Sequence, residues 1–289
     1  MTIYYDTTAI SYPSEGVIEV YNTADVLMAT FSCEFLKKGH VDEWTYVLSA
    51  CQTVVQEVGT LHLRRDNPYL DLASGRPTDP SLLSYESEPI NLSGGTFPCL
   101  LVYVRSDDAG SQPSWSIGPR FKYKFRGPSN SENRSDTMSH SSRSTAQQSA
   151  FRGELWKRDG CCIVSGAIIV QAAHILPQSR PEYYREALGW QPYNLFTPSF
   201  GLLLDGSLHD RWDHGCWALY VDPIDPSVLI VHIFDSPQHQ QYHGMRINHS
   251  RFRGLPARFP NRQLLDFHYR QCMIKHIRGF SVFPQWQAD

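Results

Sequence analysis

The two stretches QAAHILP (residues 171–177) and GLLLDGSLHDRWDHG (residues 201–215) decide how the second half of this chain folds. The first is a short apolar strand that ends on His174, and the second runs from apolar residues into a helical turn that carries His209. Asp213 follows His209 by four residues, so the two side chains share one face of that turn. The pattern predicts a small α+β arrangement in which a strand presents one histidine and a helix presents another.

The residues around these two stretches supply further elements of the same domain. A strand within RDGCCIVSG (residues 158–166) and a return strand over Ala167–His174 are expected to form a hairpin. The remaining predicted elements are helices at Ala150–Asp159, Pro181–Leu188, Leu208–Gly215 and Asn261–Arg278 and strands within Trp190–Leu203 and at Cys216–Val221 and Val228–Ile233. The last helix is amphipathic and is closed by Gly279.

A serine-rich segment predicts a division of the chain into two parts. Residues 127–149 contain almost no large apolar side chain, so we expect a flexible linker there. Residues 150–289 form the domain described above, and residues 1–126 form an N-terminal α+β unit whose sequence carries no chemical motif. The elements expected in that unit are a strand at Val26–Phe31, a helix at Val41–Gly59 and strands at Leu61–Leu63 and Leu100–Val104.

Composition and charge exclude several classes of protein. Of 289 residues, 41% are hydrophobic, which is enough for a buried core. The net charge is −3 and the pI is about 6.4, so bulk positive charge for coating DNA is absent. The seven cysteines include no C-x-x-C pair, which argues against a disulfide framework and a zinc ribbon. We expect no membrane partner and a cytoplasmic or nuclear location, because neither a signal segment nor a long apolar run occurs.

Several motifs in this half resemble the HNH endonuclease family, in the branch that is common in fungal genomes. RDGCCIVSGA, QAAHILP and GLLLDGSLHDRWDHG are similar to the three parts of the family's core, and LLDFHYRQCMIKHIRG is similar to the closing helix of fungal members. The resemblance covers about residues 150–280. It implies an α+β protein in which the N-terminal unit is followed by a C-terminal HNH-type ββα-metal domain.

The resemblance also implies roles for individual residues in the hydrolysis of phosphodiester bonds. His174 is expected to be the general base, because a neutral imidazole has a pKa near working pH. His209 is expected to be catalytic as a ligand to one divalent cation, with Asp213 as a second metal ligand. The cation would be Mg, Mn, Zn or Ni, and the partner would be DNA.

The chain departs from the family pattern at two positions. Phe200 stands where the asparagine of the triad is expected, and a phenylalanine cannot orient the base through a hydrogen bond. Ala173 stands where many related nucleases carry a metal ligand, so weak and labile metal binding is expected. Asn194 is a candidate for a displaced orienting residue. The departures leave open whether the domain is an intact or an impaired nuclease.

Two groups of residues separate the possible functions. Arg246, Arg251 and Arg253 are the predicted phosphate-binding residues of a DNA nuclease. Phe200, Trp212 and Trp190 are the predicted lining of a pocket around His174. Such a pocket favours the alternative function, a cyclase or isomerase of fungal secondary metabolism that acts on a small apolar molecule without a metal. A catalytically silent adaptor is the third possibility.

Overall fold

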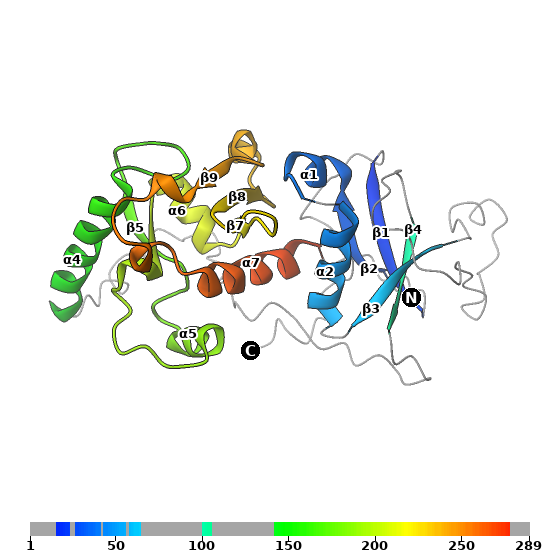
Figure 1. The fold of residues 1–289 in the computed structure, drawn as a ribbon, viewed down its shortest axis with the longest axis horizontal. Coiled ribbons are helices and arrows are strands. Elements are labelled where there is room, and N and C mark those ends of the chain that lie inside the picture. Colours follow the sequence, from blue (N-terminus) through cyan, green and yellow to red (C-terminus); the bar gives the residue numbers. More distant parts are fainter. Residues whose placement is uncertain are drawn as a thin grey trace, which may run out of the picture. The chain divides into compact units, whose positions relative to one another are not determined.

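The computed structural model describes residues 16–23, 27–41, 43–55, 58–64, 100–105 and 142–277. The chain divides into two compact units, of which the second is Phe121–Cys272, so that one boundary falls within the last helix. Each unit combines helices with strands (Figure 1), so the predicted α+β class is confirmed. None of the described helices is long and apolar enough to cross a membrane.

The first unit is built on a four-stranded sheet with the strand order β2-β1-β4-β3. Strand β1 pairs antiparallel with β2 and parallel with β4, and β3 pairs antiparallel with β4. The bounds of these strands are Val17–Asn22 for β1, Leu27–Ser32 for β2, Gly59–Leu63 for β3 and Leu100–Arg105 for β4. Three of them were predicted from sequence, whereas the first was not.

Two helices accompany this sheet. Helix α1 (Cys33–Lys38) follows β2 directly, because the hydroxyl of Ser32 accepts a hydrogen bond from the backbone N–H of Phe35 and caps the helix. Helix α2 (Glu43–Val55) packs against β2 and β3 and buries apolar residues at helical spacing, among them Val47, Ala50 and Val54. The predicted helix over Val41–Gly59 is confirmed with shorter bounds.

The second unit begins earlier than the sequence predicts. Helix α4 runs over Ser142–Asp159, so its first two turns lie inside the segment expected to be a flexible linker. Alanine and glutamine in this stretch favour a helix, and they outweigh the serines that suggested a linker. The rest of that segment, residues 127–141, lies outside the described residues.

The predicted hairpin of this unit is wrong in one of its strands. Residues around Cys162 form a tight turn instead, with hydrogen bonds from the N–H of Cys162 to the carbonyl of Ala167 (2.9 Å) and from the N–H of Gly166 to the carbonyl of Cys162 (3.0 Å). Gly160 and Gly166 take the positive φ angles of +70° and +74° that this turn requires.

The strand that carries His174 finds its partner further along the chain. Strand β5 (Gln171–His174) pairs antiparallel with β6 (Gly201–Leu204), so that His174 stands opposite Gly201. Helix α6 (Gly206–Asp213) follows β6 after one residue, and this residue, Asp205, caps the helix by accepting from the N–H groups of Ser207 and Leu208. The unit thus contains a β-β-α arrangement made of β5, β6 and α6.

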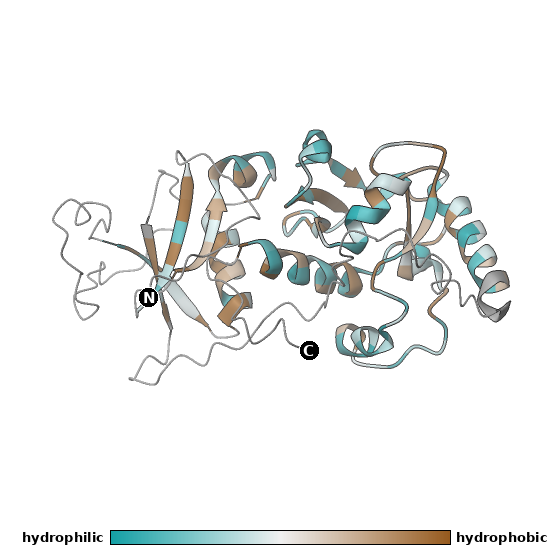
Figure 2. Cartoon of the chain, turned by 180° about the vertical axis from the view of Figure 1, so that it is seen from behind, coloured by the Kyte–Doolittle hydropathy of each residue, from teal (hydrophilic) through white to brown (hydrophobic). Residues whose placement is uncertain are grey.

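The remaining elements surround this arrangement. They are the helix α5 (Pro181–Leu188), the three-stranded sheet of β7 (Trp217–Val221), β8 (Val228–Ile233) and β9 (Arg246–Asn248), the short 3₁₀ helices η2 (Pro198–Phe200), η3 (Pro237–Tyr242), η4 (His249–Arg251) and η5 (Pro256–Arg258), and the helix α7 (Arg262–Ile277). Helices α4 and α5 present mostly hydrophilic residues, whereas hydrophobic residues gather on the strands (Figure 2). Buried apolar side chains from both sheets and from α4 to α7 form one core cluster.

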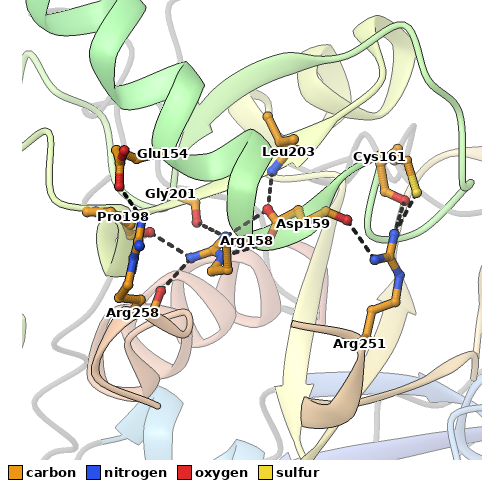
Figure 3. A network of polar contacts seen from close by, with 10 residues as sticks. Glu154, Arg158, Asp159, Cys161, Pro198, Gly201, Leu203, Arg251 and Arg258 are labelled. Atoms are coloured by element: carbon orange, nitrogen blue, oxygen red, sulfur yellow. Dashed lines mark hydrogen bonds and ion pairs between the residues drawn. The ribbon is translucent and has the colours of Figure 1, made fainter. Parts of the chain in front are cut away.

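A buried ion pair ties helix α4 to the strand β6. Arg158 and Asp159 are almost completely buried and bind each other through two hydrogen bonds. The guanidinium also donates to the carbonyls of Pro198, Gly201 and Arg258, while the carboxylate accepts from the N–H of Leu203 (Figure 3). Every polar group of the pair therefore has a partner, as a charge pair in a core requires.

Candidate active site

His174, at the end of β5, is held through both its backbone and its side chain. The indole N–H of Trp212 in α6 donates to the carbonyl of His174 at 3.2 Å. The ring of Phe151 in α4 stacks on the imidazole of His174, with 4.6 Å between the ring centroids. Gly201 is required for this stacking, because a Cβ at this position would lie 2.2 Å from the end of the Phe151 ring. Three elements therefore position the predicted base.

The environment of His174 keeps its imidazole neutral at pH 7. Burial lowers the pKa of His174 to about 4, a hydrogen bond to the backbone carbonyl of Leu195 acts in the opposite direction, and the nearby His209 lowers it further. Within the part of the chain that the structure describes, the Nε2 atom is buried and has no hydrogen-bond partner. Nδ1 is therefore the nitrogen that donates to Leu195, and the lone pair of Nε2 is left for a proton.

The backbone carbonyl of Leu195 accepts a hydrogen bond from the imidazole, as an orienting acceptor beside the base would. The side chain of Asn194 does not do this. Its oxygen accepts from the backbone N–H of Phe196 at 2.9 Å, which makes it a turn residue.

His209 and Asp213 face each other on α6, with 3.5 Å between Nε2 and Oδ2. On the opposite side of the ring, Nδ1 of His209 lies 2.8 Å from the side-chain oxygen of Gln171 in β5. An amide oxygen only accepts, so Nδ1 carries the proton and Nε2 is directed toward the carboxylate. Gln171 is a partner that the sequence motif did not suggest, although it opens the same strand as His174.

The three predicted pocket residues have different surroundings. Trp212 is buried and stacks flat on His268, with 3.8 Å between the ring centroids. Phe200 is 5% exposed and packs against Tyr184. Trp190, by contrast, is 55% exposed at the surface. Two of the three rings therefore belong to the core of the unit.

Two of the predicted phosphate-binding arginines are engaged within the fold. Arg246 pairs with the carboxylate of Asp222 at 2.7 Å. Arg251 donates to the carbonyl of Asp159 and to the sulfur of Cys161, as Figure 3 shows. The side chain of Arg253 is exposed, and its role in binding phosphate stays a prediction.

Phe200 offers a direct test of the departure from the family pattern. We expect Phe200→Asn to lower the free energy of unfolding by about 3–5 kcal/mol, because it removes a buried ring and buries an amide without partners. Denaturant unfolding of the full chain measures this, with Phe200→Leu as a control that keeps an apolar side chain and costs less than about 1.5 kcal/mol. An Asn variant as stable as the Leu variant would contradict the placement of Phe200 in the core.

The comparisons with known proteins give one match. Residues 161–220 match the family model described as HNH endonuclease. No curated protein and no solved structure matches the chain. The matched segment contains β5, β6 and α6 with His174, His209 and Asp213. Over residues 161–220, the chain is therefore similar to the HNH endonuclease family.

Proposed function

We propose that the second unit is a metal-dependent endonuclease that hydrolyses phosphodiester bonds of DNA. The observation that carries this proposal is the neutral imidazole of His174, with a free Nε2 lone pair and with His209 close enough to lower its pKa. A general base and a candidate metal ligand thus occur together in the β-β-α arrangement. The HNH segment supports DNA as the partner.

In the proposed reaction, a water molecule attacks the phosphorus and transfers its proton to Nε2 of His174. The bond between the phosphorus and the leaving oxygen breaks, and that oxygen takes a proton from solvent. His174 can act as the base because burial keeps its pKa at about 4, so it is unprotonated before the reaction at neutral pH. The Leu195 carbonyl holds the ring in the orientation that directs Nε2 toward the water.

HNH nucleases use divalent metals, and this chain offers two ligands for one. His209 presents Nε2 and Asp213 presents a carboxylate at a separation that a shared cation could bridge. Among the described residues, no group of three His, Cys, Asp or Glu side chains could hold a metal. The donor set thus fits a labile ion that completes its shell with water and a substrate phosphate. When bound, the cation would stabilise negative charge on that phosphate.

Metal binding and cleavage should fail together when the α6 ligands are changed. We expect weak binding of magnesium, manganese, nickel or zinc by calorimetry, and loss of this binding and of plasmid nicking in His209→Ala. Gln171→Ala should lower metal affinity about 10- to 100-fold, because it removes the partner that fixes the His209 tautomer. Arg211→Ala is the matched control, since this residue lies on the same helix and pairs with Asp210.

The result that contradicts the metal assignment is a tightly held ion that survives purification and is unaffected by His209→Ala. Nicking by the parent protein that continues in the presence of a chelator would contradict it as well.

A second candidate function is supported by the apolar surroundings of His174. The imidazole lies against Phe151 and Phe196, and such a dry environment would suit proton transfer on a small apolar molecule. An open cavity of about 490 Å³ in this unit is lined by Ser199, His249, Phe259, Arg262 and neighbouring residues and does not include His174. Absence of nicking with all four metals, in a folded protein, would favour this cyclase or isomerase function.

A further inference from the structure

The loop between α5 and η2, residues 189–197, lies over the predicted base. It begins at Gly189, which ends α5 with a φ of +77°. Its second half is tied by two hydrogen bonds, from the N–H of Phe196 to the side chain of Asn194 and from the hydroxyl of Thr197 to the carbonyl of Asn194. Residues 194–197 therefore form a closed turn, which carries both the Leu195 backbone that bonds to His174 and the side chain of Phe196.

The inner side of this loop covers His174. Ring centroids of Phe151, His174 and Phe196 are separated by 4.6, 5.5 and 5.9 Å. If Phe196 lay on the imidazole face opposite Phe151, the two phenylalanines would be separated by nearly the sum of the two shorter distances. The near-equal distances instead place Phe196 beside the edge of the imidazole. Nε2 of His174 is buried, and Phe151 and Phe196 both pack against its imidazole, so water and substrate reach Nε2 only after part of this packing moves.

The outer side of the same loop presents aromatic rings to solvent. Tyr193 is fully exposed, at 107%, and Trp190 is 55% exposed. Arg185, on the last turn of α5, is also exposed, as is its neighbour Glu186. Two exposed rings on the loop that covers a catalytic histidine, in a chain of net charge −3, point to recognition by stacking more than by charge.

We propose that the loop 189–197 binds single-stranded DNA by stacking unpaired bases on Tyr193 and Trp190, and that this binding turns the Phe196 side chain away from His174 while the Leu195 carbonyl keeps its hydrogen bond to the imidazole. The inference rests on the proposed nuclease function and specifies its substrate class. Unpaired bases are required because in a duplex their faces are covered by neighbouring base pairs, whereas a single strand can place each face on a ring. Arg185 would contact a phosphate of the bound strand.

Binding without cleavage tests this inference independently of catalysis. Fluorescence anisotropy with the full chain in chelator compares a labelled oligonucleotide of mixed sequence as single-stranded DNA, as duplex and as RNA. We expect the DNA single strand to bind at least tenfold more tightly than the duplex. Tyr193→Ala and Trp190→Ala should each weaken single-strand binding by about 5- to 150-fold, the range for loss of one stacked base. Both residues are exposed, so the fold should be unaffected.

Two control variants separate stacking from general apolar contact. Tyr193→Phe keeps the ring and should bind like the parent protein. Ile224→Ala removes an equally exposed apolar side chain, 91% exposed, from the turn between β7 and β8, and should have no effect on binding. Equal affinity for duplex and single strand, or unchanged affinity of Tyr193→Ala, overturns the inference, and tighter binding of RNA overturns the assignment to DNA.

The coupling to His174 has its own measurement. Histidine ring signals in NMR spectra, with that of His174 assigned by its loss in His174→Ala, should shift for His174 when the DNA single strand saturates the protein. Saturation without such a shift overturns the movement of Phe196. If binding behaves as expected but no metal supports cleavage, the loop inference holds and the nuclease function fails. If DNA is cleaved equally well after substitution of Tyr193 and Trp190, the nuclease function holds and the loop inference fails.

Discussion

Replacement of His174 by alanine should lower the turnover of DNA cleavage by about 10²–10⁴, the usual contribution of a general base. The expected loss is large because Nε2 of His174 is the atom proposed to take the proton from the attacking water, and no neighbouring group replaces it on β5. His209 does not substitute, since its nitrogens are directed toward Gln171 and Asp213. Single-turnover cleavage with saturating metal measures the effect without contributions from product release.

His214→Ala is the matched control for this variant, because it removes a half-exposed histidine from the same domain. Unchanged turnover in His174→Ala would reject the assignment for any substrate. An equal loss of turnover in both variants would also reject the assignment, because it would indicate damage to the fold and not to the chemistry.

The pH dependence of stability gives a second measurement on the same variant. The pKa of His174 is about 4 in the folded protein and about 6.5 when unfolded, so the unfolded chain binds more protons between these values. The contribution of His174 to stability is thus complete above pH 6.5 and is lost as the pH falls toward 4. The free energy of unfolding of the parent protein, measured with denaturant, should fall over this pH range more steeply than that of His174→Ala.

Replacement of Arg158 by methionine should lower the stability of the fold strongly. The side chain is 1% exposed and donates to Asp159 and to the carbonyls of Pro198, Gly201 and Arg258 (Figure 3). Its loss leaves the buried carboxylate of Asp159 without its cation. Breaking one partner of a buried pair typically costs about 3–5 kcal/mol, which is a large part of the stability of an ordinary domain. Denaturant unfolding followed by tryptophan fluorescence measures the loss.

The adjacent residue supplies the control for this prediction. Lys157 is on the same helix, but its side chain is 70% exposed and pairs with Glu154 at the surface. Lys157→Met should change the free energy of unfolding by less than about 0.5 kcal/mol. If Arg158→Met is as stable as Lys157→Met, the buried network does not hold α4 to β6. Arg158→Lys should recover little, because an ammonium group cannot reproduce the fork of hydrogen bonds.

Local patterns in the sequence were sufficient for the elements that carry the candidate site. Helix α5 has the bounds Pro181–Leu188 that its sequence predicts, with proline at its start and Gly189 at its end. His209 and Asp213 share one face of α6 because four residues make about one helical turn. The strand position of His174 followed from the short apolar run before it. These features depend on neighbours along the chain, so the sequence alone determined them.

Contacts between distant segments were decided only by the tertiary structure. An apolar strand can pair with any suitable edge, and β5 pairs with β6 because the residues around Cys162 make a turn closed by their own hydrogen bonds. The run of arginines looked like a phosphate site, but Arg251 reaches the carbonyl of Asp159 from far along the chain. The packing of Phe151 and Phe196 against His174 likewise joins segments that are distant along the chain. Residue type and spacing state what a side chain can bind, while packing in three dimensions selects the partner that it does bind.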